Sequence, residues 1–282
     1  MQDEQIGWQA GNWEINCRSI AICFLDDLKE KEPTKEAIQA AQDIIQKYRG
    51  CKLLGHKEVN EKTSCPGTLF WGEDGWNNLL NPQNKIAIDI VLLPDEPMTN
   101  RAVEVSERQS QKFNDKIVLH KEKCLPHISL AMGAIEENDL PEVNRILQEI
   151  ASQFSLFKLT ADSYRGNKIP SGETVSEFTV EKTSDLQTLH EMVMTKLKPF
   201  LSYDISVDMV FSPPTVEEIT LYWIKNYAEK SSFENFKPHI TVGFGELGDV
   251  SAPIAFTAST LALCHLGNYC TCRKVLFSAK TN

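Results

Sequence analysis

The sequence lacks the long apolar runs of a membrane protein. No stretch approaches the roughly 18 to 20 uncharged apolar residues that a membrane span needs. The N-terminus, MQDEQIGWQAGNWE, has neither the basic region nor the apolar region of a secretory signal. These absences predict a soluble protein that stays in the cytoplasm. With 282 residues, 41% of them hydrophobic, the chain can form one large domain or two ordinary ones.

An excess of positive charge is also absent. The formal net charge is −10, with 9 basic and 13 acidic residues in 1–83 and 20 basic and 26 acidic residues in 84–282. Proteins that hold long nucleic acid by its phosphates need clustered lysine and arginine, so the charge disfavours such a partner. A small phosphorylated ligand held by a few local groups is still allowed. The sequence leaves the oligomeric state open.

The sequence does not have the cysteine pattern of a disulfide framework. Its eight cysteines are scattered along a long chain without a secretory signal, which fits free thiols better than disulfides. Cys264, His265, Cys270 and Cys272 could be interpreted as a metal cluster, but C-x₅-C-x-C is not a standard zinc spacing. We expect these cysteines to pack in the interior.

The element pattern divides the chain into 1–83 and 84–282, with the boundary at Leu80-Asn81-Pro82-Gln83-Asn84. The first part predicts a strand over 19–24 and a helix starting at Pro33-Thr34. The second part mixes strands and helices without strict alternation, which indicates an α+β fold with largely antiparallel sheets. We expect helices over 98–113, 139–154 and 186–201, with Asp139 as an N-cap. Strands are expected over 85–93, 156–162, 174–181, 205–211, 218–225, 236–244, 254–265 and 269–279, and residues 117–132 are expected to form a pair of strands or one long bent strand.

One short sequence motif occurs twice in the second part, as EKCLPHISLAMGA (122–134) and ENFKPHITVGFGE (234–246). Side chains alternate faces on a strand, so His127 and Ser129 should point one way while Ile128 points into the core. The same holds for His239 and Thr241. A lone copy would most simply be a satisfied polar pair, but two copies suggest pseudo-symmetric strands that bring two imidazoles to one cleft.

Two imidazoles in one cleft suit the cleavage of a phosphodiester. With an unperturbed pKa near 6.5, one histidine can be neutral and act as general base while the other is charged and acts as general acid. The hydroxyls of Ser129 and Thr241 can donate to the non-bridging phosphate oxygens, where charge grows in the transition state. The residues therefore predict His127 and His239 as catalytic and Ser129 and Thr241 as phosphate ligands.

Residues 84–282, with motifs at His127 and His239, resemble the two-histidine phosphoesterases, which include 2′-5′ RNA ligase-like proteins. The resemblance implies a two-lobed fold in which each lobe gives one motif. It also implies action on 2′,3′-cyclic phosphates or 2′-5′-linked nucleotides or RNA ends without a metal cofactor. It does not say which histidine is acid and which is base, or whether hydrolysis or ligation is favoured.

The sequence departs from many members of that family after the second motif, where Gly243-Phe244-Gly245 replaces the arginine that they often have. Substrate recognition should then depend on other residues. The candidates are the cations Lys123, Lys237, Arg165 and Lys168, with Phe244 or Tyr164 as a base-stacking surface.

A second resemblance lies in the first part. The loop LGHKEVNEKTSCPG (54–67) and the segment IGWQAGNWEINCRSIAICF (6–24) are similar to the zinc-dependent N-acetylmuramoyl-L-alanine amidases over about 6–80. The resemblance implies His56 and Cys65 as two of three zinc ligands. The family's third ligand is an upstream histidine, and no histidine precedes His56. We expect an incomplete, partial α/β segment, binding zinc only if the site is completed upstream.

Three hypotheses remain open from the sequence. The first is a two-histidine phosphodiesterase in 84–282. The second is a zinc amidase that cleaves peptidoglycan and whose N-terminus is missing. The third is a histidine-lined cleft that binds a nucleotide without turnover.

Overall fold

The structure is a computed structural model, and it describes residues 10–48, 53–71, 75–80, 85–169, 171–211 and 215–282. Its contacts divide the chain into two compact units, Met1–Gln83 and Asn84–Asn282. The boundary loop that the sequence predicts at 80–84 lies mostly outside the described residues. Among the helices that are described, none combines the length and the apolar character needed to cross a membrane.

The described part of the first unit contains short helices and a small apolar cluster around Trp76. Its one long helix is α2 (Lys35–Lys47), which begins where predicted because the Thr34 hydroxyl accepts a hydrogen bond from the Ala37 N–H. Trp76 is 1% exposed and packs edge-on against Phe24 and Phe70. The other helices are α1 (Trp13–Asn16), α3 (His56–Val59), α4 (Asn77–Leu80) and a 3₁₀ turn at Thr68–Phe70.

The strand predicted over 19–24 is wrong, because the structure has no strand at these residues. A β-strand needs a neighbour to satisfy its backbone N–H and C=O groups. The part of this unit that is described contains helices and loops only, so no neighbouring strand is available there. An apolar run such as 19–24 cannot reveal from its own residues whether that neighbour exists.

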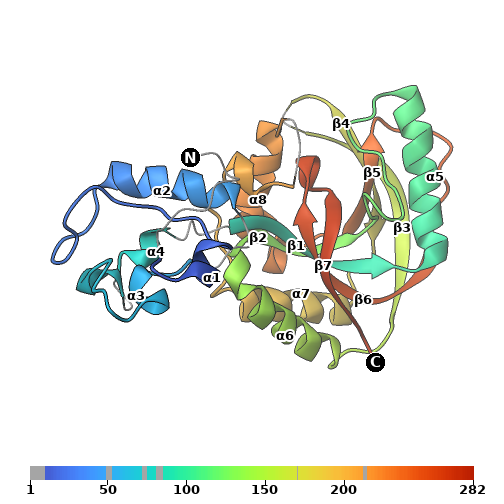
Figure 1. The fold of residues 1–282 in the computed structure, drawn as a ribbon. Helices are drawn as coiled ribbons and strands as arrows, with labels where there is room; N and C mark the ends of the chain where they lie inside the picture. The colour runs from blue at the N-terminus through green and yellow to red at the C-terminus, as the bar shows by residue number, and fades with distance from the viewer. Residues whose placement is uncertain (1–9, 49–52, 72–74, 81–84, 170, 212–214) are drawn as a thin grey trace. The chain divides into compact units, whose positions relative to one another are not determined.

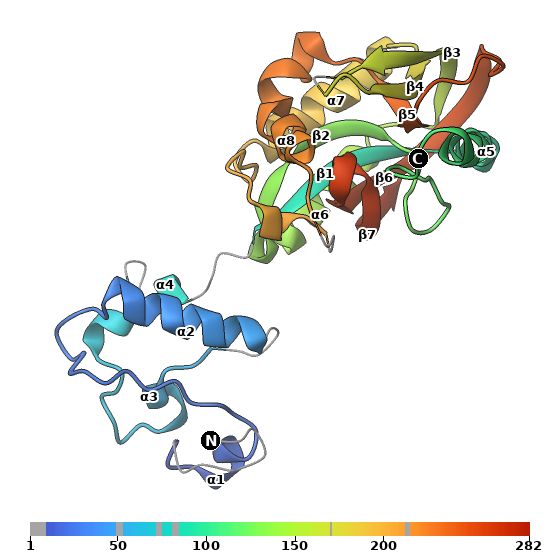
Figure 2. The same ribbon diagram turned by 90° about the horizontal axis from the view of Figure 1, so that it is seen from above.

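The second unit is a curved antiparallel sheet covered by helices (Figures 1 and 2). The strands follow the order β2-β1-β6-β3-β4-β5, with β7 also paired to β6. Every pairing is antiparallel, which confirms the predicted α+β class. The strands are β1 (Lys85–Pro94), β2 (Ile128–Glu136), β3 (Phe157–Lys168), β4 (Thr174–Val180), β5 (His239–Phe244), β6 (Ile254–Leu266) and β7 (Cys272–Lys280).

Strand β6 joins the two lobes of this sheet. Its first residues, Ile254 to Ala258, pair with β3, and its later residues pair with β1 and β7. One lobe therefore contains β2, β1, β6 and β7, and the other contains the start of β6 with β3, β4 and β5. The two strands at the ends of the path, β2 and β5, contact each other. Because these strands carry the two histidine motifs, the curvature of the sheet brings the motifs together.

The helices of this unit cross between the lobes. Helix α5 (Glu96–Lys112) follows β1 but packs on β5, and α7 (Ser184–Leu197) follows β4 but packs on β2. Helix α6 (Leu140–Ala151) lies beside α7, while α8 (Glu218–Lys230) packs on β2 at the opposite end of the unit from α5 (Figures 1 and 2). One apolar core runs through both lobes as a result.

Most predicted elements of this unit are confirmed, but three are wrong. Residues 218–225 form part of α8, and their buried side chains, Thr220, Ile224 and Tyr227, follow helical spacing. Residues 205–211 contain a 3₁₀ turn at Val207–Met209, and β2 begins only at Ile128, eleven residues after the predicted start. Asp139 does precede α6, but its side chain makes no capping hydrogen bond, because a 3₁₀ turn leads into the helix.

His190 on α7 joins the first motif to the segment that precedes the second motif. Its Nδ1 donates to the carbonyl of Leu130 in the first motif at 2.8 Å. Its Nε2 accepts from the N–H of Phe233 at 2.7 Å, and its ring stacks on Phe236, just before the second motif. The side chain is fully buried, so this histidine is structural.

Candidate active site

Both histidine motifs lie at the starts of strands that end the sheet. In β2 the aliphatic Ile128 and Leu130 are fully buried, whereas His127 and Ser129 are half-buried. In β5, Ile240 and Val242 are likewise fully buried. The face alternation predicted from the sequence is confirmed: aliphatic side chains anchor each strand, and each imidazole shares the other face with a hydroxyl.

The likeness of the two motifs extends to a backbone irregularity. Val91 pairs with Ser129 and Ile90 with Ala131, so the ladder skips Leu130. Glu177 pairs with Thr241 and Ser176 with Gly243, so the ladder skips Val242. Both strands therefore carry a β-bulge at the residue that follows the motif hydroxyl, Leu130 in β2 and Val242 in β5. Such an extra residue bends a strand and re-aims the neighbouring side chains.

Each motif histidine is held by a carbonyl two residues before it. Nδ1 of His127 donates to the Leu125 carbonyl at 2.7 Å, and Nδ1 of His239 donates to the Lys237 carbonyl at 2.8 Å. A carbonyl oxygen only accepts hydrogen bonds, so Nδ1 carries the hydrogen in both rings. In a neutral ring Nε2 is then unprotonated and available as a base.

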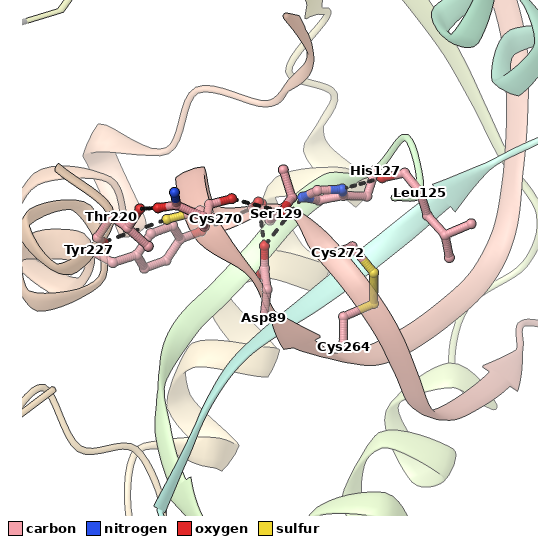
Figure 3. Close-up of polar contacts among 11 residues, drawn as sticks. Asp89, Leu125, His127, Ser129, Thr220, Tyr227, Cys264, Cys270 and Cys272 are labelled. Carbon is pink, nitrogen blue, oxygen red and sulfur yellow. Dashed lines mark hydrogen bonds and ion pairs between the residues drawn. A yellow bond between two sulfur atoms is a disulfide. The ribbon is translucent and has the colours of Figure 1, made fainter. Parts of the chain in front are cut away.

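His127 lies against a buried carboxyl group. Its Nε2 is 3.6 Å from Oδ2 of Asp89, a fully buried residue of β1, and the Ser129 hydroxyl donates to the same oxygen at 2.5 Å (Figure 3). The imidazole side chain is 12% exposed. Burial, with a smaller contribution from the charge of His239, lowers the pKa of His127 to about 4. His127 is therefore neutral at physiological pH.

His239 has a more open environment. Its side chain is 40% exposed, and its Nε2 lies 3.8 Å from Oε2 of Glu177 on β4. The other oxygen of Glu177 accepts hydrogen bonds from Arg165 on β3, at 3.2 and 3.3 Å. A carboxylate at this distance is a counter-ion for a charged imidazole. The two histidines thus have different surroundings, although their backbones are alike.

A disulfide lies beside the first motif, which corrects the expectation of free, packing cysteines at these positions. Cys264 and Cys272 are bonded, with Cα atoms 5.5 Å apart (Figure 3). The antiparallel pairing of β6 with β7 brings them within reach of each other, a proximity that cysteine spacing alone does not reveal. Cys272 accepts a backbone hydrogen bond from Leu125, whose own carbonyl holds His127.

The predicted substrate-contact residues fall into different environments. Arg165 is next to the site through Glu177, and Lys123, Lys168 and Lys237 are exposed, so their contacts with substrate stay predictions. Phe244 as a stacking surface is wrong, because its ring is 1% exposed and belongs to the core.

Tyr164 is half-buried and already has structural contacts. Its ring packs against Phe178, and its hydroxyl accepts from the Leu247 N–H.

Two acidic residues of the site, Asp89 and Glu177, are not among those predicted from the sequence. Asp89 had a signal, since it is the one charged residue inside the apolar run Ile86–Leu93 and a charge in a buried strand needs an explanation. Glu177 had none. It is an ordinary polar residue of an amphipathic strand, and only the pairing of β4 with β5 places it opposite Thr241.

Comparison with known protein families identifies the second unit. The profile of the 2′-5′ RNA ligase superfamily matches residues 97–263, which include both histidine motifs. The chain belongs to the 2′-5′ RNA ligase superfamily. The match agrees with the resemblance to two-histidine phosphoesterases, which the duplicated Pro-His-Ile-Ser/Thr motif had indicated.

Solved structures with a similar arrangement include two bacterial proteins. E. coli LigT complexed with phosphate gives a TM-score of 0.41 at 12% identity, covering 70% of this chain and 98% of LigT. TT0787 of Thermus thermophilus gives a TM-score of 0.42 at 17% identity, covering 69% of this chain and 97% of that one.

The first unit matches a different family. The N-acetylmuramoyl-L-alanine amidase profile matches residues 1–68. Peptidoglycan-recognition protein SD of Drosophila melanogaster is 33% identical over 63 residues, which are 20% of this chain and 33% of that protein. The chain thus spans about a third of this curated relative.

The two zinc ligands implied by that resemblance fit a metal site only in part. Nε2 of His56 is buried and has no hydrogen-bond partner, as a ligand atom awaiting a metal would be. Cys65 is exposed at the level of the whole residue. Partial desolvation of its thiol, with a contribution from nearby Cys23, raises the pKa of Cys65 and disfavours the thiolate that binds zinc. Among the described residues, no third His, Cys, Asp or Glu completes the group. A catalytic zinc needs three protein ligands, so we derive no chemical step through this metal.

Proposed function

We propose that residues 84–282 form a metal-independent phosphodiesterase that acts on 2′,3′-cyclic or 2′-5′-linked phosphodiesters of nucleotides or RNA ends. The observation that carries the proposal is the matched pair of imidazoles on β2 and β5. Both commit Nδ1 to a backbone carbonyl and so leave Nε2 for proton transfer. Membership of the 2′-5′ RNA ligase superfamily supports the same class of substrate.

The different surroundings of the two rings suggest their roles. The lowered pKa of His127 favours its neutral form, so His127 acts as the general base. His239, with the Glu177 carboxylate beside Nε2, acts as the general acid. A substrate enters with its phosphorus between the two Nε2 atoms, and the hydroxyls of Ser129 and Thr241 donate to its non-bridging oxygens.

In hydrolysis, Nε2 of His127 takes a proton from a water molecule as the water oxygen bonds to phosphorus. The bond from phosphorus to the leaving ribose oxygen breaks, and His239 donates its Nε2 proton to that oxygen. His127 then carries the proton taken from water and His239 has given its proton to the leaving oxygen, so loss of a proton from His127 to solvent and uptake of one by His239 restore both rings. Each of these proton transfers contributes roughly 10²- to 10⁴-fold to the rate.

The test is a screen of 2′,3′-cyclic nucleotides and 2′-5′-linked dinucleotides with the full chain, with and without EDTA. We expect His127→Ala and His239→Ala each to lower kcat by at least about 100-fold. EDTA should leave turnover of the wild type unchanged. His120→Ala is the matched control, because His120 is an exposed histidine outside both motifs.

Full activity in either motif variant would contradict the proposal. Tight nucleotide binding without product, over long incubation, would favour a binding cleft instead. An amidase activity is not proposed for the first unit, because the described residues provide two of the three zinc ligands that it needs.

A further inference from the structure

Asp89 is a carboxyl group enclosed beneath the first motif. It lies on β1, whose neighbours β2 and β6 flank it on both sides, and it is 0% exposed. Oδ2 forms the 2.5 Å hydrogen bond with the Ser129 hydroxyl, while Oδ1 is buried and accepts no hydrogen bond of normal geometry. The Ala131 backbone N–H adds a weaker favourable interaction. These contacts are few for a carboxylate, which can accept about four hydrogen bonds.

The groups that face Asp89 do not supply a positive charge. In the part of the chain that is described, His127 is the only basic side chain that lies within ion-pair distance of Asp89, and His127 is neutral because its pKa is lowered to about 4. Tyr227 approaches from α8 and Cys270 from the hairpin between β6 and β7, and burial raises the pKa of both, so they keep their protons. Burial also raises the pKa of Asp89 well above its usual value. A buried carboxylate without a counter-charge is costly, and such a group is neutralised by taking up a proton.

A charged Asp89 would also oppose the bound substrate. A phosphodiester is an anion, and Ser129 can donate its single hydroxyl hydrogen to only one acceptor at a time. If Asp89 were ionised, its carboxylate would hold that hydrogen and would repel the phosphate. If Asp89 is protonated, its own hydrogen can occupy the short contact between Oδ2 and the Ser129 oxygen. The Ser129 hydroxyl hydrogen is then free for the phosphate.

We propose that Asp89 is a positioning residue that keeps its proton and donates it in a hydrogen bond from Oδ2 to Oγ of Ser129. This bond directs the Ser129 hydroxyl hydrogen to a non-bridging oxygen of the phosphodiester. No proton leaves Asp89 during turnover. The inference rests on the proposed function, because it requires phosphate at Ser129.

The second motif has no equivalent of this arrangement. The register of β4 with β5 places Val175 where Asp89 stands in the first motif, since Val175 pairs with Phe244 as Asp89 pairs with Met132. The acidic residue of that lobe is Glu177, which is partly exposed and already paired with Arg165. Asp89 therefore gives a hydrogen-bond donor to the hydroxyl of Ser129, whereas Val175 at the matching position gives none to the hydroxyl of Thr241.

The decisive variants are Asp89→Asn and Asp89→Ala. An asparagine amide donates a hydrogen bond as a protonated carboxyl does but carries no charge, so Asp89→Asn should keep kcat within about threefold of the wild type. Asp89→Ala leaves Ser129 without this donor and should lower kcat by about 10- to 100-fold. In a Ser129→Ala background, Asp89→Ala should cost little more, because the two residues act as one unit.

Loss of activity in Asp89→Asn equal to that in Asp89→Ala would overturn the proposal, since it would mean that the carboxylate itself is required. Wild-type activity in both variants would also overturn it. Asp95→Asn serves as the control, because Asp95 caps α5 through the Met98 N–H and bonds Thr257. Its loss should lower stability while kcat is retained.

Infrared difference spectra of the wild type minus Asp89→Asn, recorded near neutral pH without substrate, test protonation directly. We expect the carbonyl stretch of a protonated carboxylic acid in the wild type. A carboxylate band in its place would refute the inference. Because no turnover is needed, this result is separable from failure of the proposed function, which would appear as activity surviving in His127→Ala.

Discussion

Leu130 and Val242 are the residues at which the two motif strands bulge away from their neighbours. They occupy the same position in two segments that lie far apart in the sequence, and in both cases the adjoining strand leaves them unpaired. A bulge turns the side chains before it relative to the rest of the strand. The two copies thus share backbone geometry as well as sequence, and in both the imidazole and the hydroxyl that alternate onto one face lie just before the bulge.

The pH dependence of kcat/KM should reflect the unusual environment of His127. A general base works only in its neutral form, so its contribution is lost as the pH falls through its pKa of about 4. We therefore expect no acidic limb near pH 6.5, where an ordinary histidine base would titrate, and a fall in kcat/KM as the pH is lowered toward about 4. The measurement is kcat/KM across roughly pH 4 to 8, with circular dichroism at each pH to detect unfolding. An acidic limb centred near the ordinary histidine value would contradict the assignment of His127 as base.

The stability of the Asp89→Asn variant should differ from the wild type in a pH-dependent way. The pKa of Asp89 is raised in the folded state, so the folded protein binds a proton that the unfolded chain has lost. Wild-type stability therefore falls as the pH rises above the unfolded value of about 3.9, by up to about 1.4 kcal/mol per pH unit until the folded pKa is reached. Asparagine removes this term.

We expect the free energy of unfolding of Asp89→Asn, relative to that of the wild type, to increase between about pH 4 and 7. Urea denaturation at a series of pH values measures it. A difference that changes with pH in the opposite direction would mean that Asp89 is stabilised as a carboxylate.

Replacement of His190 should destabilise the second unit. His190→Leu removes the donor to the Leu130 carbonyl, in a buried bond, and the acceptor of the Phe233 N–H, in a part-buried one. An unsatisfied buried polar group costs about 1 to 3 kcal/mol, and the part-buried Phe233 N–H costs less because water can reach it, so the free energy of unfolding should fall by at least about 1 to 3 kcal/mol. Chemical denaturation measures this loss. His120→Leu is the matched exposed control, and an equal effect in both variants would argue against the role given to His190.

Reduction of the disulfide should loosen the support of His127. Without the Cys264–Cys272 bond, the chain gains entropy on unfolding, which costs about 2 to 3 kcal/mol of stability for a loop of this size. The Leu125 N–H donates to the carbonyl of Cys272, and the Leu125 carbonyl in turn holds His127. Loss of the disulfide should therefore lower kcat as well as stability. The double variant Cys264→Ala, Cys272→Ala is compared with the wild type, each with and without reductant. A reductant effect that persists in the double variant would show that another group is responsible.

Much of the site could be predicted from the sequence, because the features that define it involve residues close together in the chain. The alternation of imidazole and hydroxyl with buried aliphatics follows from strand geometry, and the duplication of the phrase indicated two strands of one cleft. The start of helix α2 could be predicted for the same reason, since the side chain of Thr34 caps it. By contrast, 218–225 was mistaken for a strand because its apolar residues alternate over a few positions, and only the packing of Thr220, Ile224 and Tyr227 reveals the helix.

The sequence by itself determined the two motifs, the α+β class and the identity of the paired histidines as the centre of interest, because each depends on residues close together in the chain. Tertiary structure decided the differences between the two halves. The partners of His127 and His239, namely Asp89 and Glu177, come from neighbouring strands, and burial lowers the pKa of His127 while the ring of His239 is more exposed. Pairing between strands and exclusion of water are properties of the folded sheet, so no spacing in the sequence could reveal them.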